Sequence, residues 1–186
     1  MLSMSTLAAP SKLFAYYKQL GEKAMAQVKD DDLHRVLASD ANSIAMIVRH
    51  MAGNMRSRFT DFLTSDGEKP WRDRDSEFVD AGQDRAALLA DWESGWTCFF
   101  SAIAPLTDAD LSRTVYIRNE GHTVMDALHR QLAHYAYHVG QIVLLARGFA
   151  GDEWTSLSIP RNASQQFNAD KFSKPKEKKH FTDGEK

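Results

Sequence analysis

The sequence contains little cysteine and no long apolar run. Cys98 is the only cysteine among 186 residues, so the chain cannot form an internal disulfide. No segment approaches the roughly 18 apolar residues that a membrane-spanning helix needs. The N-terminal region also lacks the sustained apolar stretch and small-residue cleavage site of a secretion signal. These absences favour a cytoplasmic protein without a membrane partner.

The chain also lacks an excess of charge of one sign. Its 23 Lys and Arg residues oppose 25 Asp and Glu residues, which gives a formal net charge of -2. Such a balance offers no basic field to recruit nucleic acid, so we expect no nucleic-acid partner. The length fits a single domain, which would bury roughly two-thirds of the surface that the unfolded chain exposes.

Apolar residues recur at helical spacing in four stretches, whereas the alternation typical of strands is nearly absent. We therefore expect an all-α fold, an up-and-down four-helix bundle with helices over residues 11–28, 40–64, 83–103 and 124–147. The second helix carries a stripe that steps by four and three residues, as a bundle-facing helix requires: Ile44, Val48, Met51, Met55, Phe59 and Phe62. The fourth helix carries the clearest stripe: Val124, Leu128, Leu132, Tyr135, Val139, Ile142 and Ala146.

The segments between and after these helices are expected to be irregular. Residues 67–82 form a long charged loop between the second and third helices, and loops of this length are often functional. The segment TVYIRNEGHT has extended character but is too short to assign as a strand. Residues 171–186 hold six lysines and no apolar periodicity, so we expect an irregular, flexible C-terminal tail after one bundle domain over residues 1–170.

Local patterns predict three further details. Thr107 with Asp110 predicts a capping box, and Thr123 with Asp126 predicts the N-cap of the fourth helix. Cys98 lies among aromatic residues, which favours a packed core thiol over a nucleophile. The third helix should turn its apolar side chains inward before a proline ends it: Leu88, Leu89, Trp92, Trp96 and Phe99.

The histidines of the fourth predicted helix fall on two different faces. At about 100° per residue, His134 and His138 lie about 40° apart with side chains about 6 Å from each other, which suits two imidazoles that share one ion. His129 lies about 180° from His138, and His122 falls close to His129 on that opposite side. We therefore exclude His122 and His129 as ligands.

A stable metal site needs a third ligand from elsewhere in the chain, and His50 is the natural candidate. Each of the three histidines immediately precedes a residue of its apolar stripe, so all three lie on the same flank of their helices. In a bundle, such a flank would hold a metal ion and still admit a small molecule. The residues alone leave two interpretations open: a metal site of His50, His134 and His138, or three ordinary, partly buried histidines bonded to their neighbours.

Four segments in this order resemble the DinB-like superfamily, specifically a subfamily without an assigned activity: RHMAGNMRSRFTDFL, GEKPWRDRDSEF, QLAHYAYHVGQIVLLARG and SLSIP. The resemblance spans nearly the whole chain. It implies a four-helix bundle, commonly in a homodimer, that binds one divalent ion, often nickel or zinc, through one histidine of the second helix and two of the fourth. His50, His134 and His138 occupy those positions, so the resemblance favours the metal site. The superfamily includes thiol S-transferases that act with bacillithiol or mycothiol, and the glutathione-linked maleylpyruvate isomerase type.

Three neutral imidazoles leave at least one coordination position of an ion free, which is typical of a catalytic site. A cation there would favour the thiolate form of a bound thiol or the hydroxide form of a bound water. The sequence contains no H-E-x-x-H motif, which argues against a peptidase. Two functions stay open: a metal-dependent S-transferase or hydrolase that acts on a small substrate, and a non-catalytic stress protein that binds a metal or ligand. Three imidazoles accept nickel, zinc, iron or copper, so they do not identify the ion.

Two amide side chains are candidates for orienting an imidazole or a substrate. Asn54 lies one turn after His50, and Gln141 lies three residues after His138. An alternative interpretation is that both are polar residues at the rim of the bundle.

Arginines offer a second set of candidate contacts. Arg58 and Arg72 are candidates for binding an anionic thiol or acid. In the long charged loop, Trp71, Arg72 and Arg74 could cover the mouth of the site and bind such an anion. The alternative for this loop is tertiary anchoring, in which Trp71 and Phe78 plug the bundle and the Arg and Asp residues form exposed pairs. We favour anchoring.

Overall fold

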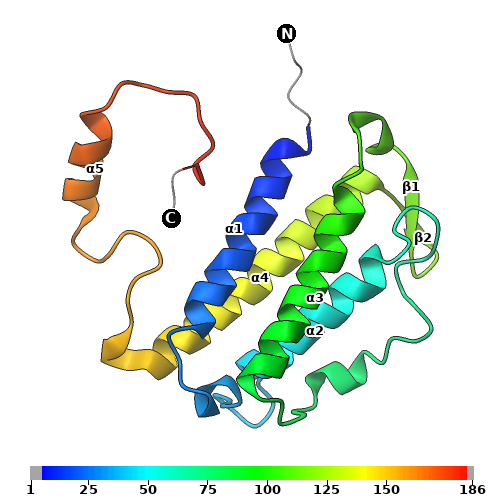
Figure 1. The fold of residues 1–186 in the computed structure, drawn as a ribbon, viewed down its shortest axis with the longest axis horizontal. Coiled ribbons are helices and arrows are strands. Elements are labelled where there is room, and N and C mark those ends of the chain that lie inside the picture. The colour runs from blue at the N-terminus through cyan, green and yellow to red at the C-terminus, as the bar shows by residue number, and fades with distance from the viewer. Residues whose placement is uncertain (1–5, 184–186) are drawn as a thin grey trace.

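The structure is a computed structural model that describes residues 6–183. Within that range the chain is mostly helical, with one small sheet, so the expected all-α class holds broadly and the sheet is an addition to it. The elements are α1 (Ala8–Met25), α2 (Ile44–Phe59), α3 (Arg85–Ile103), β1 (Thr114–Ile117), β2 (Glu120–Thr123), α4 (Val124–Ala150) and α5 (Ser164–Phe172). The four long helices lie side by side, with α2 packed on both α3 and α4, and α1 packed on α4 (Figure 1).

Helix α2 begins and ends inside its predicted range. Ser43 caps its N-terminus by accepting a hydrogen bond from the Met46 amide, so the predicted start at Asp40 was too early. The helix stops at Phe59 because Thr60 is extended and Asp61 takes a positive φ of 51°. The apolar stripe nevertheless continues into the following turns, and every member of it is buried.

Helix α4 begins where the sequence predicted. The Thr123 side chain accepts a hydrogen bond of 3.0 Å from the Asp126 amide, which confirms the N-cap. The helix runs through Gly148, where we had placed its end, and stops before Gly151, which adopts a positive φ of 55°. Gly148 is tolerated inside the helix because a glycine lowers helix propensity by only about 1 kcal/mol.

Aromatic side chains from three helices form the centre of the core. Phe14, Trp96, Phe99 and Tyr135 are fully buried, and the Phe14 and Phe99 rings lie 4.3 Å apart between centroids. Leu89, predicted to face inward, is 37% exposed. It lies about 100° from its buried neighbour Leu88, which places it at the edge of the inward face.

Cys98 is half-buried and packs against the core, and its sulfur lies 3.7 Å from Thr60 Oγ1. The capping box of Thr107 and Asp110 is present around a short 3-10 turn, as predicted. None of the described helices combines the length and apolar character needed to cross a membrane.

The segment TVYIRNEGHT, over residues 114–123, forms a β-hairpin. Thr114 pairs with Thr123 and Ile117 with Glu120, in antiparallel register. The two residues of its turn, Arg118 and Asn119, both have positive φ, as the tight turns that suit hairpins require. Strands of four residues carry too little alternation to be recognised from the sequence.

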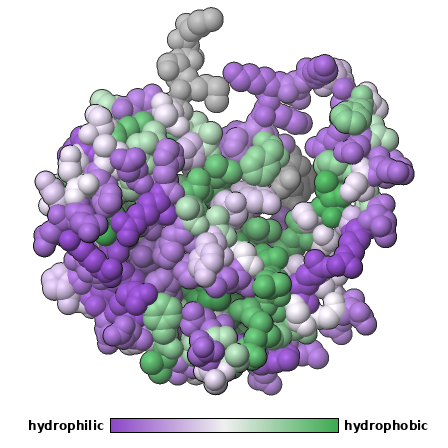
Figure 2. Space-filling view, turned by 180° about the vertical axis from the view of Figure 1, so that it is seen from behind, coloured by the Kyte–Doolittle hydropathy of each residue, from purple (hydrophilic) through white to green (hydrophobic). Residues whose placement is uncertain are grey.

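The C-terminal segment forms an arm beside the four long helices, in which α5 has no buried residue (Figures 1 and 2). Helix α5 is not the irregular structure that we predicted after α4. The described part of the predicted tail contacts α1, where Lys12 pairs with Asp183 at 2.6 Å and Phe181 packs on Tyr16. Residues 1–5 of the predicted domain and 184–186 of the predicted tail lie outside the described residues.

Candidate metal centre

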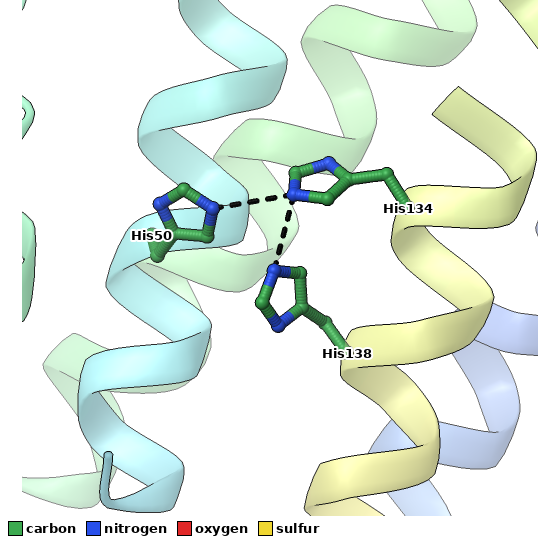
Figure 3. Close-up of side chains that lie close together, drawn as sticks. All are labelled: His50, His134 and His138. Carbon is green, nitrogen blue, oxygen red and sulfur yellow. Dashed lines mark hydrogen bonds between the residues drawn. The ribbon is translucent and has the colours of Figure 1, made fainter. Parts of the chain in front are cut away.

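Three histidines from two helices point toward one another between α2 and α4 (Figure 3). His134 Nε2 lies 3.3 Å from His50 Nε2 and 3.1 Å from His138 Nε2. Within residues 6–183 this is the one group of three or more histidine, cysteine or acidic side chains whose ligand atoms lie close enough to share an ion, all within 4.8 Å. Nitrogens bound tetrahedrally to one ion at about 2.0–2.1 Å lie about 3.3 Å apart, so the two separations at His134 fit ligands of a shared cation.

Hydrogen bonds hold the outer nitrogen of two of the rings. His50 Nδ1 donates to Glu77 Oε2 at 2.9 Å, and His138 Nδ1 donates to Gln141 Oε1 at 2.7 Å. A ring whose Nδ1 carries the proton presents the lone pair of its Nε2. Both Nε2 atoms therefore face the centre in the tautomer that a metal ligand requires.

Burial keeps the two imidazoles of α4 neutral. Burial, and to a smaller extent the neighbouring His138 and His50, lower the pKa of His134 to about 3. Burial also lowers the pKa of His138 to about 4, although the hydrogen bond with Gln141 opposes this shift. Both rings are thus uncharged at neutral pH, which is the state that binds a metal ion.

Glu77 connects the centre to a buried arginine. Its carboxylate accepts two hydrogen bonds from Arg72, of 2.8 and 2.9 Å, in addition to the one from His50. Burial alone would raise the pKa of Glu77, but the hydrogen bonds from His50 and Arg72 lower it below its ordinary value. Gly53 of α2 makes room for this carboxylate, because a Cβ at that position would collide with it.

The long charged loop does not anchor the fold in the way that we predicted. Trp71 is 59% exposed and does not pack into the helical core. Phe78 is half-buried and packs on the His50 ring, with 4.8 Å between centroids. Arg72 is buried in its pair with Glu77, because a 3-10 turn over Asp75–Phe78 directs Glu77 inward.

A cavity of about 190 Å³ lies beside His50 and His134. The other lining residues are all polar: Asn54, Arg58, Arg72, Arg74, Arg118, Arg130 and Gln131. The candidate contacts Asn54, Arg58 and Arg72 therefore share one cavity with two of the histidines. Asn54 is held there by Tyr135, whose hydroxyl donates to Asn54 Oδ1 at 3.1 Å.

Gln141, the fourth candidate contact, does not line the cavity and bonds His138 instead. His122 and His129, which we excluded as ligands, lie outside the histidine group.

Four residues of the site were not anticipated: Glu77, Arg118, Arg130 and Gln131. Arg130 and Gln131 precede His134 by four and three residues, and this helical spacing could have identified them. Glu77 and Arg118 come from a loop and a hairpin turn, where no periodic signal relates them to the histidines.

The comparisons with known proteins give one match. The sequence matches the model of a family described as a protein of unknown function, DUF1572, over residues 2–163. No curated protein and no solved structure matches the chain. Because the match covers well over half of its length, the chain belongs to the DUF1572 family of proteins of unknown function.

Proposed function

We propose that this protein binds one divalent metal ion through His50, His134 and His138 and is an enzyme that acts on a small substrate. The observation that carries the proposal is the convergence of three imidazole nitrogens from α2 and α4. Nickel and zinc are the preferred ions, since both accept imidazole ligands and the resemblance to the DinB-like superfamily implies the same two ions.

Two features favour a catalytic centre over a structural one. Structural zinc sites close with four protein ligands, whereas within the described chain no fourth histidine, cysteine or acidic residue joins this group. The polar cavity beside His50 and His134 would bring a small molecule to the open coordination position. When bound, the ion would act as a Lewis acid that lowers the pKa of a thiol or of water.

The reaction that we favour is thiol S-transfer, with hydrolysis as the alternative. This choice rests on the resemblance to the DinB-like thiol transferases. The arrangement of α1 to α4 is compatible with the four-helix bundle of that superfamily, and the same resemblance implies a homodimer, which sedimentation would test.

Metal analysis tests the first part of the proposal. Purified protein should carry about one nickel or zinc ion per chain. His138→Ala should lower the metal occupancy at least about tenfold, as expected when one ligand of the ion is lost. His129→Ala is the matched control, because this histidine lies exposed on the same helix outside the group. Equal metal content in the wild type and His138→Ala would contradict the proposal.

Turnover tests the second part. Metal-loaded protein should accelerate the conjugation of a low-molecular-weight thiol with a chromogenic electrophile, and chelation should abolish the rate until metal is restored. Metal binding without turnover across a panel of thiols and esters would instead favour a non-catalytic metal-binding protein.

A further inference from the structure

We propose that the cavity beside the histidines is an anion site and that the substrate is a small acid with a carboxylate or phosphate group. The identification of this anion as a substrate rests on the proposed function. Among the described residues, no acidic side chain lines the cavity, whereas five arginine side chains do: Arg58, Arg72, Arg74, Arg118 and Arg130.

Neighbouring glutamates neutralise only part of this positive charge. Glu77 is engaged by Arg72 and by the imidazole of the metal centre. Glu68 Oε2 lies 3.1 Å from a terminal nitrogen of Arg58, 3.1 Å from one of Arg118 and 3.7 Å from one of Arg72, so one carboxylate pairs with three guanidinium groups. Two glutamates against five arginines leave the cavity with an excess of positive charge.

Two of the arginines have no strong acidic partner within residues 6–183. A terminal nitrogen of Arg130 lies 3.4 Å from His122 Nε2, and Arg130 forms no ion pair with the described residues. Arg74 lies 3.9 Å from Asp75, whose carboxylate is fully in solvent, where such pairs contribute little. The guanidinium groups of Arg74 and Arg130 are therefore available to a ligand.

Two buried polar atoms at the cavity also point to a ligand. Arg58 Nε and Gln131 Oε1 are buried and form no hydrogen bond within the described part of the chain. The two residues are only 7% and 3% exposed. Buried polar atoms are nearly always hydrogen-bonded in native proteins. A ligand that accepts from Arg58 and donates to Gln131 would satisfy both atoms.

The size and chemistry of the cavity define the class of ligand. Guanidinium groups bind carboxylate and phosphate groups through paired hydrogen bonds. The volume of about 190 Å³ is below the roughly 300–1,000 Å³ of sites for drug-sized ligands, so it fits a small acid or the acidic end of a larger molecule. An acid group held by the arginines would place the rest of that molecule beside His50 and His134.

Calorimetric titration with inorganic phosphate and with succinate at low ionic strength tests the inference. Arg118→Gln and Arg130→Gln each remove an exposed cavity arginine, and Arg147→Gln is the matched control because Arg147 is exposed on α4 outside the cavity. We expect the affinity for at least one probe to fall about tenfold in each cavity variant and to stay unchanged in the control. Failure of the wild type to bind either probe, or wild-type affinity in both cavity variants, would overturn the inference.

His138→Ala separates this inference from the metal proposal, because His138 belongs to the histidine group but does not line the cavity. The metal-depleted variant should still bind the probe, and Arg130→Gln in that background should weaken binding as it does in the wild type. If the purified wild-type protein carries no metal and still shows arginine-dependent probe binding, the metal centre alone would be overturned. Metal binding without arginine-dependent probe binding would overturn the anion site alone.

Discussion

Glu77 Oε2 lies 2.9 Å from His50 Nδ1 and directs the opposite nitrogen of that ring toward the other two histidines. The carboxylate is itself fixed by two hydrogen bonds from Arg72. A loop residue that is no ligand thus orients one imidazole of the candidate centre.

Glu77→Gln should lower the metal affinity about 10–100-fold, the usual range for a residue that orients a ligand. A neutral amide holds the Nδ1 proton of His50 less strongly and cannot form the same charged pair with Arg72. Competition with a chromogenic chelator measures the affinity. Glu93→Gln is the control, because Glu93 is exposed and pairs only with Lys18 and Thr97 among the described residues. Unchanged affinity in Glu77→Gln would show that His50 needs no carboxylate partner.

Gly53→Ala should destabilise the protein and weaken metal binding, although alanine is the better helix former by about 1 kcal/mol. The added Cβ would collide with the Glu77 carboxylate and displace it from His50. Gly140→Ala is the matched control in α4, since nothing lies within 4 Å of its Cβ position, and it should be neutral or stabilising. Urea unfolding and chelator competition measure the two effects. A Gly53→Ala protein with wild-type metal affinity would contradict the expectation.

The metal-free protein should lose stability as the pH falls from about 6.5 toward 4. The pKa values of His134 and His138 are lowered to about 3 and about 4 in the folded state, whereas an unfolded histidine titrates near about 6.5. Between these values the unfolded chain binds more protons than the folded chain, so acid favours unfolding. The stabilisation is fully present above about pH 6.5 and is lost progressively below it.

Urea unfolding of metal-free protein at pH 7 and pH 5 measures this dependence. His138→Ala should show a shallower fall in the free energy of unfolding, because the variant lacks one of the two titrating groups and relieves the charge interaction that lowers the pKa of His134. The same slope in the variant and the wild type would be evidence against buried neutral imidazoles.

Trp96→Ala should lower the free energy of unfolding by about 3–5 kcal/mol, as expected for deleting a large core side chain. Trp96 is fully buried and contacts the rings of Trp92, Phe99 and Tyr135. Trp71→Ala should change the stability by less than about 0.5 kcal/mol, because Trp71 is 59% exposed. Thermal or urea unfolding distinguishes the two, and equal losses would contradict the assignment of Trp96 to the core.

Local periodicity accounts for most of what could be predicted. The apolar stripes located the four long helices, and the separation of His134 and His138 placed both rings on one face of α4. Both inferences depend only on the helical repeat, which can be recognised from residues close together in the sequence. The ends of α1, expected over residues 11–28 and found at Ala8–Met25, the ends of α2 and the length of α4 were missed because capping and turn geometry decide where a helix stops.

Contacts between segments that are distant in the sequence decided which side chains form the candidate site. Packing of α2 on α4 brings His50 to the other two rings, and only the folded loop brings Glu77 to His50. The arginines of the cavity come from α2, the long charged loop, the hairpin turn and α4. Their spacing along the sequence therefore does not predict that they line one cavity. The sequence by itself determines the helices, because the helical repeat involves residues only three or four positions apart. A pocket lined by side chains from separate elements forms only when those elements pack together, so the tertiary structure decides it.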